Sequence, residues 1–464
     1  MILKSVHVSG FHCYQKETFD IGENFTILIG KNGSGKSSLV KAIKTALSVF
    51  FSNNSSWDYP SIVGSVSDLR ITNLASSEVW HDNNMKPADF VQIEVDAKCR
   101  LSNGISDFPS WSFYKASTSA AKVQSTYYKE AYIYFRKNYT DRSVWPLFMY
   151  YSDRYPHIDA NLSNAAKEMI GEEIPYRSWA YYHWDHDTSC ALIWQERYKR
   201  IYKLNFARQM TYNRMEDKSS DEAKICKEEI DKYTAELDYV LKYLKMFTSD
   251  GIEMLSDNSM SLKITDLIVD EIDEESYIVA YFADGSRRRW DELPAGYERL
   301  YNIVFDIAYR SYILNRGIAA PQGVVLIDEL DLHLHPSMEQ DVLNRLLYTF
   351  DEIQFIVTTH SPLVISNTTL KQGGKIILLK NSDNGYESTE CDNLYGLDYD
   401  YVLSAVMRTE PRHFKLKELK QKYIRLRSRQ NNTKADKTLQ DIEALNPDKF
   451  EDIKRELEQQ LDEM

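Results

Sequence analysis

The sequence predicts an α/β fold built from buried parallel strands and the helices between them. Short apolar segments, which are typical of buried strands, recur in the first and last thirds of the 464-residue chain. Amphipathic segments of helical period separate these strands. The middle third is polar and aromatic and interrupts the alternation, so we interpret it as an insertion between two halves of one domain.

The composition is that of a folded protein without a membrane span. Apolar residues make up 43% and charged residues 27% of the chain, as in ordinary globular domains. No run approaches the roughly 20 apolar residues that a spanning helix needs, and residues 1–11 lack the pattern of a signal peptide. We therefore expect a cytoplasmic protein with no membrane partner. The five cysteines are scattered, so disulfides and structural zinc are not expected.

The first predicted strands are residues 2–8 and 25–29, and the second runs directly into a glycine-rich turn. The turn has the pattern G-x-x-x-x-G-K-[ST]. The pattern comprises Gly30, Lys31, Asn32, Gly33, Ser34, Gly35, Lys36 and Ser37, and we add the next residue, Ser38, to the predicted nucleotide-binding residues. A predicted helix follows, so backbone amides and the positive end of the helix would converge on a phosphate chain. Lys36 would reach the β- and γ-phosphates, and the Ser37 hydroxyl would ligate Mg²⁺. A chance glycine- and serine-rich loop is the alternative, and the strand and helix around the turn argue against it.

The middle of the chain is expected to be mainly helical. Residues 91–95 alternate as in a strand, and residues 147–151 form a buried apolar strand. Residues 219–247 carry an apolar stripe of helical period, long enough for a short coiled-coil arm. Many of the 32 tyrosines lie in this middle part, where rings beside Lys and Arg could stack nucleic-acid bases. Packing within an irregular helical insert is the alternative that we favour.

Two acidic residues end the apolar strand at residues 324–327. Asp328 is placed to hold Mg²⁺ through water, and Glu329 to polarise an attacking water. A solvated acidic turn is the alternative, which the phosphate-binding turn upstream disfavours. The next apolar strand, residues 353–358, is followed by His360. This histidine could sense a γ-phosphate or play a purely structural role.

A glycine lies near the start of the apolar helix expected over residues 293–310. Such a helix start can offer backbone amides to an anion. Pro294 lies in the same segment, and proline is common in the first turn of any helix. The residues alone therefore leave the role of Gly296 open between anion binding and ordinary helix-start chemistry.

In this order, the motifs resemble those of ABC-type ATPases of the SMC/RecF branch. The resemblance rests on residues 2–11, 25–36, 326–329 and 359–362. It implies an ABC/SMC-type ATPase head that binds ATP, with Mg²⁺ held by Ser37 and Asp328. It implies catalytic roles for Glu329 and His360. It also implies a head-to-head dimer, in which Gly296 and the helix behind it cap the γ-phosphate bound by the partner.

Two residues depart from the pattern of the branch. Pro294 stands where the branch usually has Ser, so a hydroxyl donor is missing, and His12 stands where Arg is common. We therefore expect nucleotide binding with slow hydrolysis.

A finer resemblance is to the PtuA family of Septu and retron-linked bacterial defence ATPases. It rests on residues 293–297, 306–310 and 393–400 and on the charged helical segment after them. In that family the ATPase assembles with an HNH nuclease encoded beside it. The resemblance implies an ATPase that regulates a PtuB-like HNH nuclease in anti-phage defence, as a dimer or a larger oligomer with an even number of copies.

Motifs and pattern together divide the chain into four segments. Residues 1–100 would be the N-terminal half of the head, 101–260 the mainly helical insertion with its arm, and 261–400 the C-terminal half of the head. Residues 401–464 would be a charged helical tail for partner docking.

The tail has two oppositely charged parts. Residues 412–437 hold ten Lys or Arg and two acids, and residues 441–464 hold nine acids and three basic residues. The parts could pair with each other, the basic part could touch DNA phosphates, or the tail could dock a partner. Asp398 and Asp400 could bind metal ions, but helix capping explains them better. We therefore expect no nuclease within this chain.

The net charge of −13 argues against a generally DNA-binding surface. Any DNA contact would be indirect or would use local basic patches. The alternative function is a stand-alone RecF-like DNA-repair ATPase that binds DNA directly. A transporter ATPase subunit is a third hypothesis, against which the aromatic insertion and the missing Ser-Gly-Gly motif argue.

Overall fold

The computed structural model describes most of the chain. The described residues are 1–51, 70–101, 104–117, 121–139, 143–155, 164–185, 191–249, 262–272, 275–370, 373–382, 385–407, 414–429, 431–445 and 447–462. They form two compact units, Met1–Gly396 and Leu397–Met464. None of the helices in these residues combines the length and the apolar character that crossing a membrane requires.

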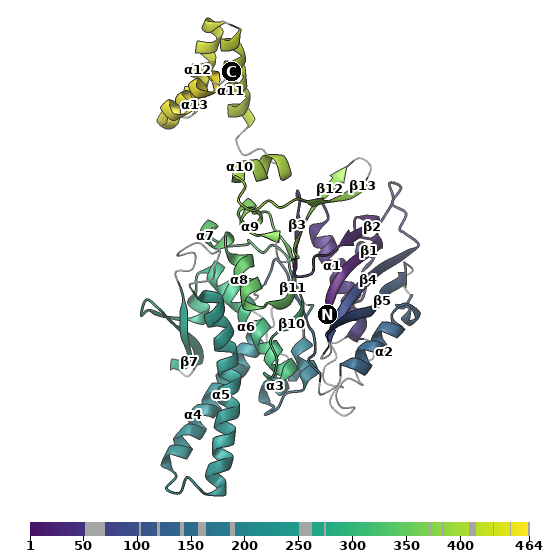
Figure 1. The fold of residues 1–464 in the computed structure, drawn as a ribbon, viewed down its shortest axis with the longest axis vertical. Coiled ribbons are helices and arrows are strands. Elements are labelled where there is room, and N and C mark those ends of the chain that lie inside the picture. Colours follow the sequence, from purple (N-terminus) through teal and green to yellow (C-terminus); the bar gives the residue numbers. More distant parts are fainter. Residues whose placement is uncertain are drawn as a thin grey trace. The chain divides into compact units, whose positions relative to one another are not determined.

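The larger unit is built on a six-stranded sheet with the order β13-β12-β3-β11-β10-β6 (Figure 1). Its strands are β3 (Phe25–Ile29), β6 (Leu147–Tyr151), β10 (Gln322–Ile327), β11 (Glu352–Thr358), β12 (Lys375–Ser382) and β13 (Gly385–Cys391). The strands from β12 to β6 are parallel, and β13 pairs with β12 in the antiparallel direction. Strands β3, β6 and β10 are buried at every position, as expected where helices cover both faces. This sheet confirms the predicted α/β fold.

A second sheet is antiparallel, with the order β2-β1-β4-β5. Its strands are β1 (Ile2–Phe11), β2 (Tyr14–Asp20), β4 (Phe90–Leu101) and β5 (Gly104–Ala116). Helix α1 (Lys36–Leu47) lies between the two sheets, since it contacts β1 and β4 as well as β10 and β11. The apolar face of α1 is therefore buried on both sides, which fixes the start of the helix beside the ends of β3 and β10.

The segment after residue 100 contributes a strand to each sheet. β5 pairs with β4 in one hairpin, and β6 lies beside β10 in the central sheet. The sequence gives no clear sign of β5, because its first four residues are all exposed and the alternation appears only near its end. The helical insertion is thus joined to both sheets, and the assignment of the segments to domains stays a prediction.

A small sheet and several helices complete the larger unit. The small sheet consists of β7 (Ile264–Ile272), β8 (Glu275–Phe282) and β9 (Arg287–Arg289). Apart from α1 and the two helices of the arm, the α-helices described in the larger unit are α2 (Lys129–Asn138), α3 (Asn164–Gly171), α6 (Ala295–Asn315), α7 (Pro336–Glu339), α8 (Val342–Thr349) and α9 (Pro362–Ser366). Helix α6 is buried along nearly its whole length, and it packs against β6 and α5 (Asp221–Thr248).

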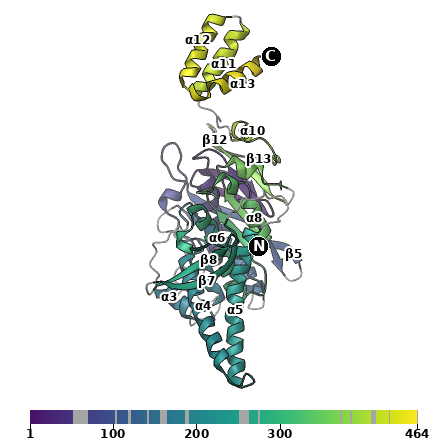
Figure 2. The ribbon, with the colours of Figure 1, turned by 90° about the vertical axis from the view of Figure 1, so that its left-hand side faces the viewer.

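Helices α4 (Ala191–Arg214) and α5 (Asp221–Thr248) form a hairpin that projects from the larger unit (Figures 1 and 2). The second helix lies where the sequence predicts the arm. Near its base, Arg197 and Glu236 pair at 2.8 Å, and Tyr309 of α6 donates a hydrogen bond to the same carboxylate. Large aromatic side chains of the insertion are buried in the larger unit: Trp179, Tyr181, Tyr182, Trp184, Trp194 and Tyr198. Their burial favours the packing interpretation of the aromatic-rich insertion.

The C-terminal unit is helical. It contains α10 (Tyr399–Tyr401), a turn of π-helix (Val402–Val406), α11 (Phe414–Ser428), α12 (Asn432–Leu445) and α13 (Phe450–Asp462). Tyr423, Ala435, Ile442 and Leu457 form the centre of its own apolar core. Lys420 pairs with Glu456 and Arg427 with Asp436, each at 2.7 Å. The predicted pairing between the charged parts of the tail is thus present at Lys420–Glu456, while Arg412 lies outside the described residues.

Candidate functional site

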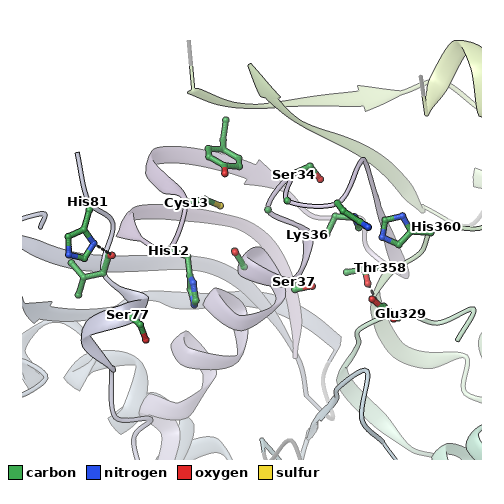
Figure 3. A pocket seen from close by; sticks show the side chains of 16 residues that line it. His12, Cys13, Ser34, Lys36, Ser37, Ser77, His81, Glu329, Thr358 and His360 are labelled. Carbon is green, nitrogen blue, oxygen red and sulfur yellow. Dashed lines mark hydrogen bonds between the residues drawn. The ribbon is translucent and has the colours of Figure 1, made fainter. Parts of the chain in front are cut away.

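The glycine-rich turn, the acidic strand end and His360 surround one cavity of about 730 Å³ (Figure 3). This volume lies within the range of small-molecule sites. The cavity is lined by His12, Cys13, Asn32, Gly33, Ser34, Gly35, Lys36, Ser37, Ser38, Ser77, Val79, His81, Glu329, Thr358, His360 and Tyr386. Figure 3 shows Lys36, Glu329 and His360 at one side and His12, Ser77 and His81 at the other.

Lys36 is held by the turn that precedes it. Its Nζ donates hydrogen bonds to the carbonyl oxygens of Gly30 at 2.9 Å and Lys31 at 3.2 Å. Gly30 and Lys31 therefore contribute backbone to the site and are not among the described residues that line the cavity. Burial lowers the pKa of the Lys36 ammonium. A ligand with negative oxygens would replace the two carbonyls as the partner of this ammonium.

Gly35 makes the turn possible. Its φ is +102°, and a Cβ there would lie 2.4 Å from the hydroxyl of Tyr14. This hydroxyl donates a hydrogen bond to the Gly35 carbonyl at 2.9 Å, so the turn is fixed from β2. Only glycine suits this conformation and this close approach.

Three oxygen-bearing side chains meet beside the start of α1. The Ser37 hydroxyl donates to Oδ1 of Asp328 at 3.1 Å, and the Thr358 hydroxyl donates to the same atom at 2.7 Å. Hydroxyl and carboxylate oxygens are the ligands that Mg²⁺ prefers. The donor set therefore fits this ion, with Ser37 at the cavity wall and Asp328 behind it.

Glu329 has an unusual backbone that aims it at the cavity. Its φ is +53°, which is rare for a residue other than glycine. Its amide donates to the Thr358 hydroxyl at 2.7 Å, which holds the residue from the neighbouring strand. Burial, followed by the charge of Asp328, raises the pKa of the Glu329 carboxyl. A carboxylate with a raised pKa is a better acceptor for a proton from water.

The backbone at His360 is held by Asp331, a residue that the motifs did not single out. Oδ1 of Asp331 accepts the hydroxyl of Thr359 at 2.6 Å and the amide of His360 at 3.3 Å. Burial, followed by the charge of Lys36, lowers the pKa of the His360 imidazole. The ring is therefore neutral at neutral pH and can donate one hydrogen bond into the cavity.

Gly296 lies apart from the cavity. It is on the first turn of α6, and a Cβ there would lie 2.6 Å from the carbonyl oxygen of His333. Among the described residues, none from this turn lines the cavity. The glycine thus allows close packing of α6 on the loop after β10, which the residue pattern could not show.

Sequence reasoning missed several residues of the wall. Thr358 precedes Thr359 and His360 directly, so its position at the end of a parallel strand was a usable signal. Ser77, Val79 and His81 come from a loop-like stretch with no motif. A bridge between Val79 and Phe11 brings that stretch to the end of β1, and only the fold shows this.

The sequence also raised the question of metal binding outside this cavity, at Asp398 and Asp400 and at the cysteines. Oδ1 of Asp398 accepts the amide of Asp400 at 2.9 Å, so Asp398 caps the short helix α10 as expected. In the parts of the chain that the structure describes, no three His, Cys, Asp or Glu side chains gather as a metal site.

Comparison with known proteins gives a family match and several relatives. A family model described as an AAA ATPase domain matches residues 1–365. The Retron Ec83 probable ATPase of Escherichia coli is 25% identical over 433 residues, which cover 84% of this chain and 75% of that protein. The Retron Vc95 probable ATPase of Vibrio cholerae is 25% identical over 414 residues, covering 80% of this chain and 72% of that protein. Septu protein PtuA of Bacillus mycoides is 29% identical over 168 residues, covering 36% of this chain and 23% of that protein.

Solved structures of SMC heads also align with this chain. An Smc head bound to the C-winged helix domain of ScpA has a TM-score of 0.42 at 15% identity, covering 84% of this chain and 98% of that one. The SMC head domain of Thermotoga maritima has a TM-score of 0.40 at 10% identity, covering 84% of this chain and 100% of that one.

Proposed function

Because this chain belongs to the AAA ATPase domain family, we propose that its cavity binds ATP with Mg²⁺ and hydrolyses the terminal phosphate. The observation that carries the proposal is the gathering of Lys36, Ser37 and Glu329 around one cavity, at the ends of β3 and β10. A buried lysine, a hydroxyl beside a carboxylate and a second carboxylate of raised pKa are the groups that phosphate binding, metal binding and water activation require.

Each group has a distinct role in this proposal. Lys36 and the backbone amides of the turn hold the phosphates at the start of α1. Ser37 and Asp328 hold Mg²⁺, which when bound neutralises charge on the phosphate oxygens. Glu329 accepts a proton from the attacking water. His360, as a neutral ring, donates a hydrogen bond to the γ-phosphate.

We also propose that two copies pair head to head across this cavity. Among the described residues, none from the first turn of α6 lines the cavity of its own chain, and no side chain caps the start of this helix. A helix start of this kind is suited to an anion supplied from outside the chain. Gly296 would then cap the γ-phosphate bound by a second copy, with Pro294 in place of a hydroxyl donor and slow hydrolysis as the result.

The third part of the proposal is a partner. We propose that the ATPase assembles with a PtuB-like HNH nuclease and regulates it in anti-phage defence, with the charged helical tail of residues 401–464 as the docking module. The relatives named as Septu PtuA and as retron ATPases support this assignment. The separate apolar core of α11–α13 supports a module that folds by itself.

Hydrolysis by the purified full chain tests the first part. We expect Mg²⁺-dependent release of phosphate from ATP, which Lys36→Ala reduces at least about tenfold because a phosphate-binding charge is lost. Lys41→Ala, on the same helix but outside the cavity wall, is the matched control and should hydrolyse ATP like the parent. Absence of both ATP binding and hydrolysis in the parent protein would contradict the proposal.

Co-expression with the neighbouring reading frames tests the partner. We expect a nuclease to co-purify, and plasmid cleavage by the complex to change with ATP and with Lys36→Ala. If no partner co-purifies and the isolated chain instead binds DNA with a steep dependence on salt, the RecF-like repair function replaces this one.

A further inference from the structure

Arg299 occupies a buried position between the start of α6 and the acidic end of β10. It lies one turn into α6 and is 1% exposed. Its Nη2 donates hydrogen bonds to the carbonyl oxygens of Asp328 at 3.0 Å and Glu329 at 3.1 Å. Its Nη1 donates to the carbonyl of Tyr155 at 2.7 Å and, more weakly, to that of Ser152 at 3.4 Å. One guanidinium thus ties together the segments that follow β6 and β10.

Arg299 contacts Glu329, whose backbone has a rare conformation. Glu329 has a φ of +53°, a conformation that persists only where the surroundings enforce it. Thr358 holds the amide of Glu329 from β11, and Arg299 holds its carbonyl from α6. The two contacts thus hold the amide and the carbonyl of Glu329, the backbone groups before and after its Cα.

We propose that Arg299 is a positioning residue for hydrolysis, which holds the backbone of Glu329 so that its carboxylate faces the attacking water. The inference rests on the proposed ATPase function. Arg299 is absent from the described wall of the cavity, so it acts through Glu329 and does not touch the nucleotide. Its role is therefore separable from binding.

The chemistry of the side chain makes the proposal testable. A guanidinium is a planar fork with donors pointing in several fixed directions, whereas a lysine ammonium is a single point charge. Lysine at this position keeps the charge but cannot reach both strand ends at once. Arg299→Lys should therefore loosen Glu329 and leave Lys36 and the glycine-rich turn unchanged.

The experiment compares hydrolysis with nucleotide affinity in the full chain. For Arg299→Lys we expect the turnover number to fall about tenfold or more, as for other small displacements of a catalytic group. The dissociation constant of a fluorescent ATP analogue should stay within about twofold of the parent value, because the groups that bind the nucleotide, Lys36 and the glycine-rich turn, are unchanged. The matched control is Arg345→Lys in α8, where a buried arginine also donates to two backbone carbonyls, those of Phe247 and Ser249, away from the cavity. It should lose stability but keep its turnover number.

A double variant asks whether Arg299 acts through Glu329. Glu329→Gln alone should reduce hydrolysis, and adding Arg299→Lys should reduce it no further, because the group being positioned is already lost. Equal hydrolysis by Arg299→Lys and the parent, an additive loss in the double variant, or a parallel loss of nucleotide affinity would each overturn the inference. A parent protein that hydrolyses no ATP at all would instead remove the proposed function on which the inference rests.

Discussion

The hydroxyl of Thr358 donates a hydrogen bond to the carboxylate of Asp328 at 2.7 Å and accepts one from the amide of Glu329 at 2.7 Å. This single side chain at the end of β11 therefore connects the residue proposed for Mg²⁺ with the residue proposed for water activation. It lies between the two because β11 is the central neighbour of β3 and β10. The order of the strands thus sets the geometry of the acidic pair.

Thr358→Val tests this connection. Valine has nearly the same shape but lacks the hydroxyl, so Asp328 loses a donor and the Glu329 amide loses its acceptor. We expect a lower turnover number and a higher Mg²⁺ concentration for half-maximal hydrolysis, with the fold retained. Phosphate release over a Mg²⁺ titration measures both. Thr349→Val removes another buried hydroxyl, one bonded only to the Arg345 carbonyl, and should leave both quantities unchanged.

The pH dependence of hydrolysis follows from the raised pKa of Glu329. Burial is the largest cause, and the charges of Asp328, Asp153 and Asp331 add to it. Because the carboxylate must be ionised to accept a proton, the rate should fall at acidic pH, and it should do so above the usual range for a glutamate. Removing a nearby negative charge lowers that pKa, so activity should persist to lower pH.

Asp153→Asn is the variant for this test, since Asp153 is exposed and does not line the cavity. We expect the acidic limb of the pH–rate profile to move to lower pH. Asp351→Asn makes the same change of charge at the opposite end of β11 and should leave the limb in place. If the acidic limb of the pH–rate profile does not move in Asp153→Asn, a group other than Glu329 controls the fall in rate.

The parts of the site that follow one another in the chain could be predicted from the sequence. The turn around Lys36 is local, and the acids after β10 and the histidine after β11 meet because parallel strands bring their carboxyl ends to one edge. Arg299 and His81 could not be found in this way, since each reaches its partners through contacts between distant segments. Gly296 shows the same limit, because its packing on His333 involves a contact across 37 positions.

The base of the helical arm gives a prediction about stability. Arg197 of α4 and Glu236 of α5 form a buried pair with two hydrogen bonds, at 2.8 and 3.1 Å. Glu236→Gln leaves the arginine buried without its counter-charge, and we expect the free energy of unfolding to fall by about 3–5 kcal/mol. Glu229→Gln removes the partner of Arg208 in an exposed pair of the same hairpin and should cost only about 0–1 kcal/mol. Chemical denaturation of the full chain measures the free energy of unfolding of both variants. Equal losses in the two variants would contradict the view that the buried pair stabilises the base of the arm more than the exposed pair does.

Gly296→Ala separates packing from ligand binding at the start of α6. A Cβ would lie 2.6 Å from the His333 carbonyl, so the first turn of the helix must move or strain. We expect a loss of about 1–3 kcal/mol in the free energy of unfolding, as for other overpacked sites. Because Arg299 lies on the next turn, hydrolysis should fall as well. Gly171→Ala, at a helical glycine with open space around it, should be neutral in both assays. If Gly296→Ala instead keeps the stability of the parent and loses only the ATP-dependent pairing of two copies, the glycine is needed for capping the nucleotide of the second copy. Its close approach to His333 would then not contribute to stability.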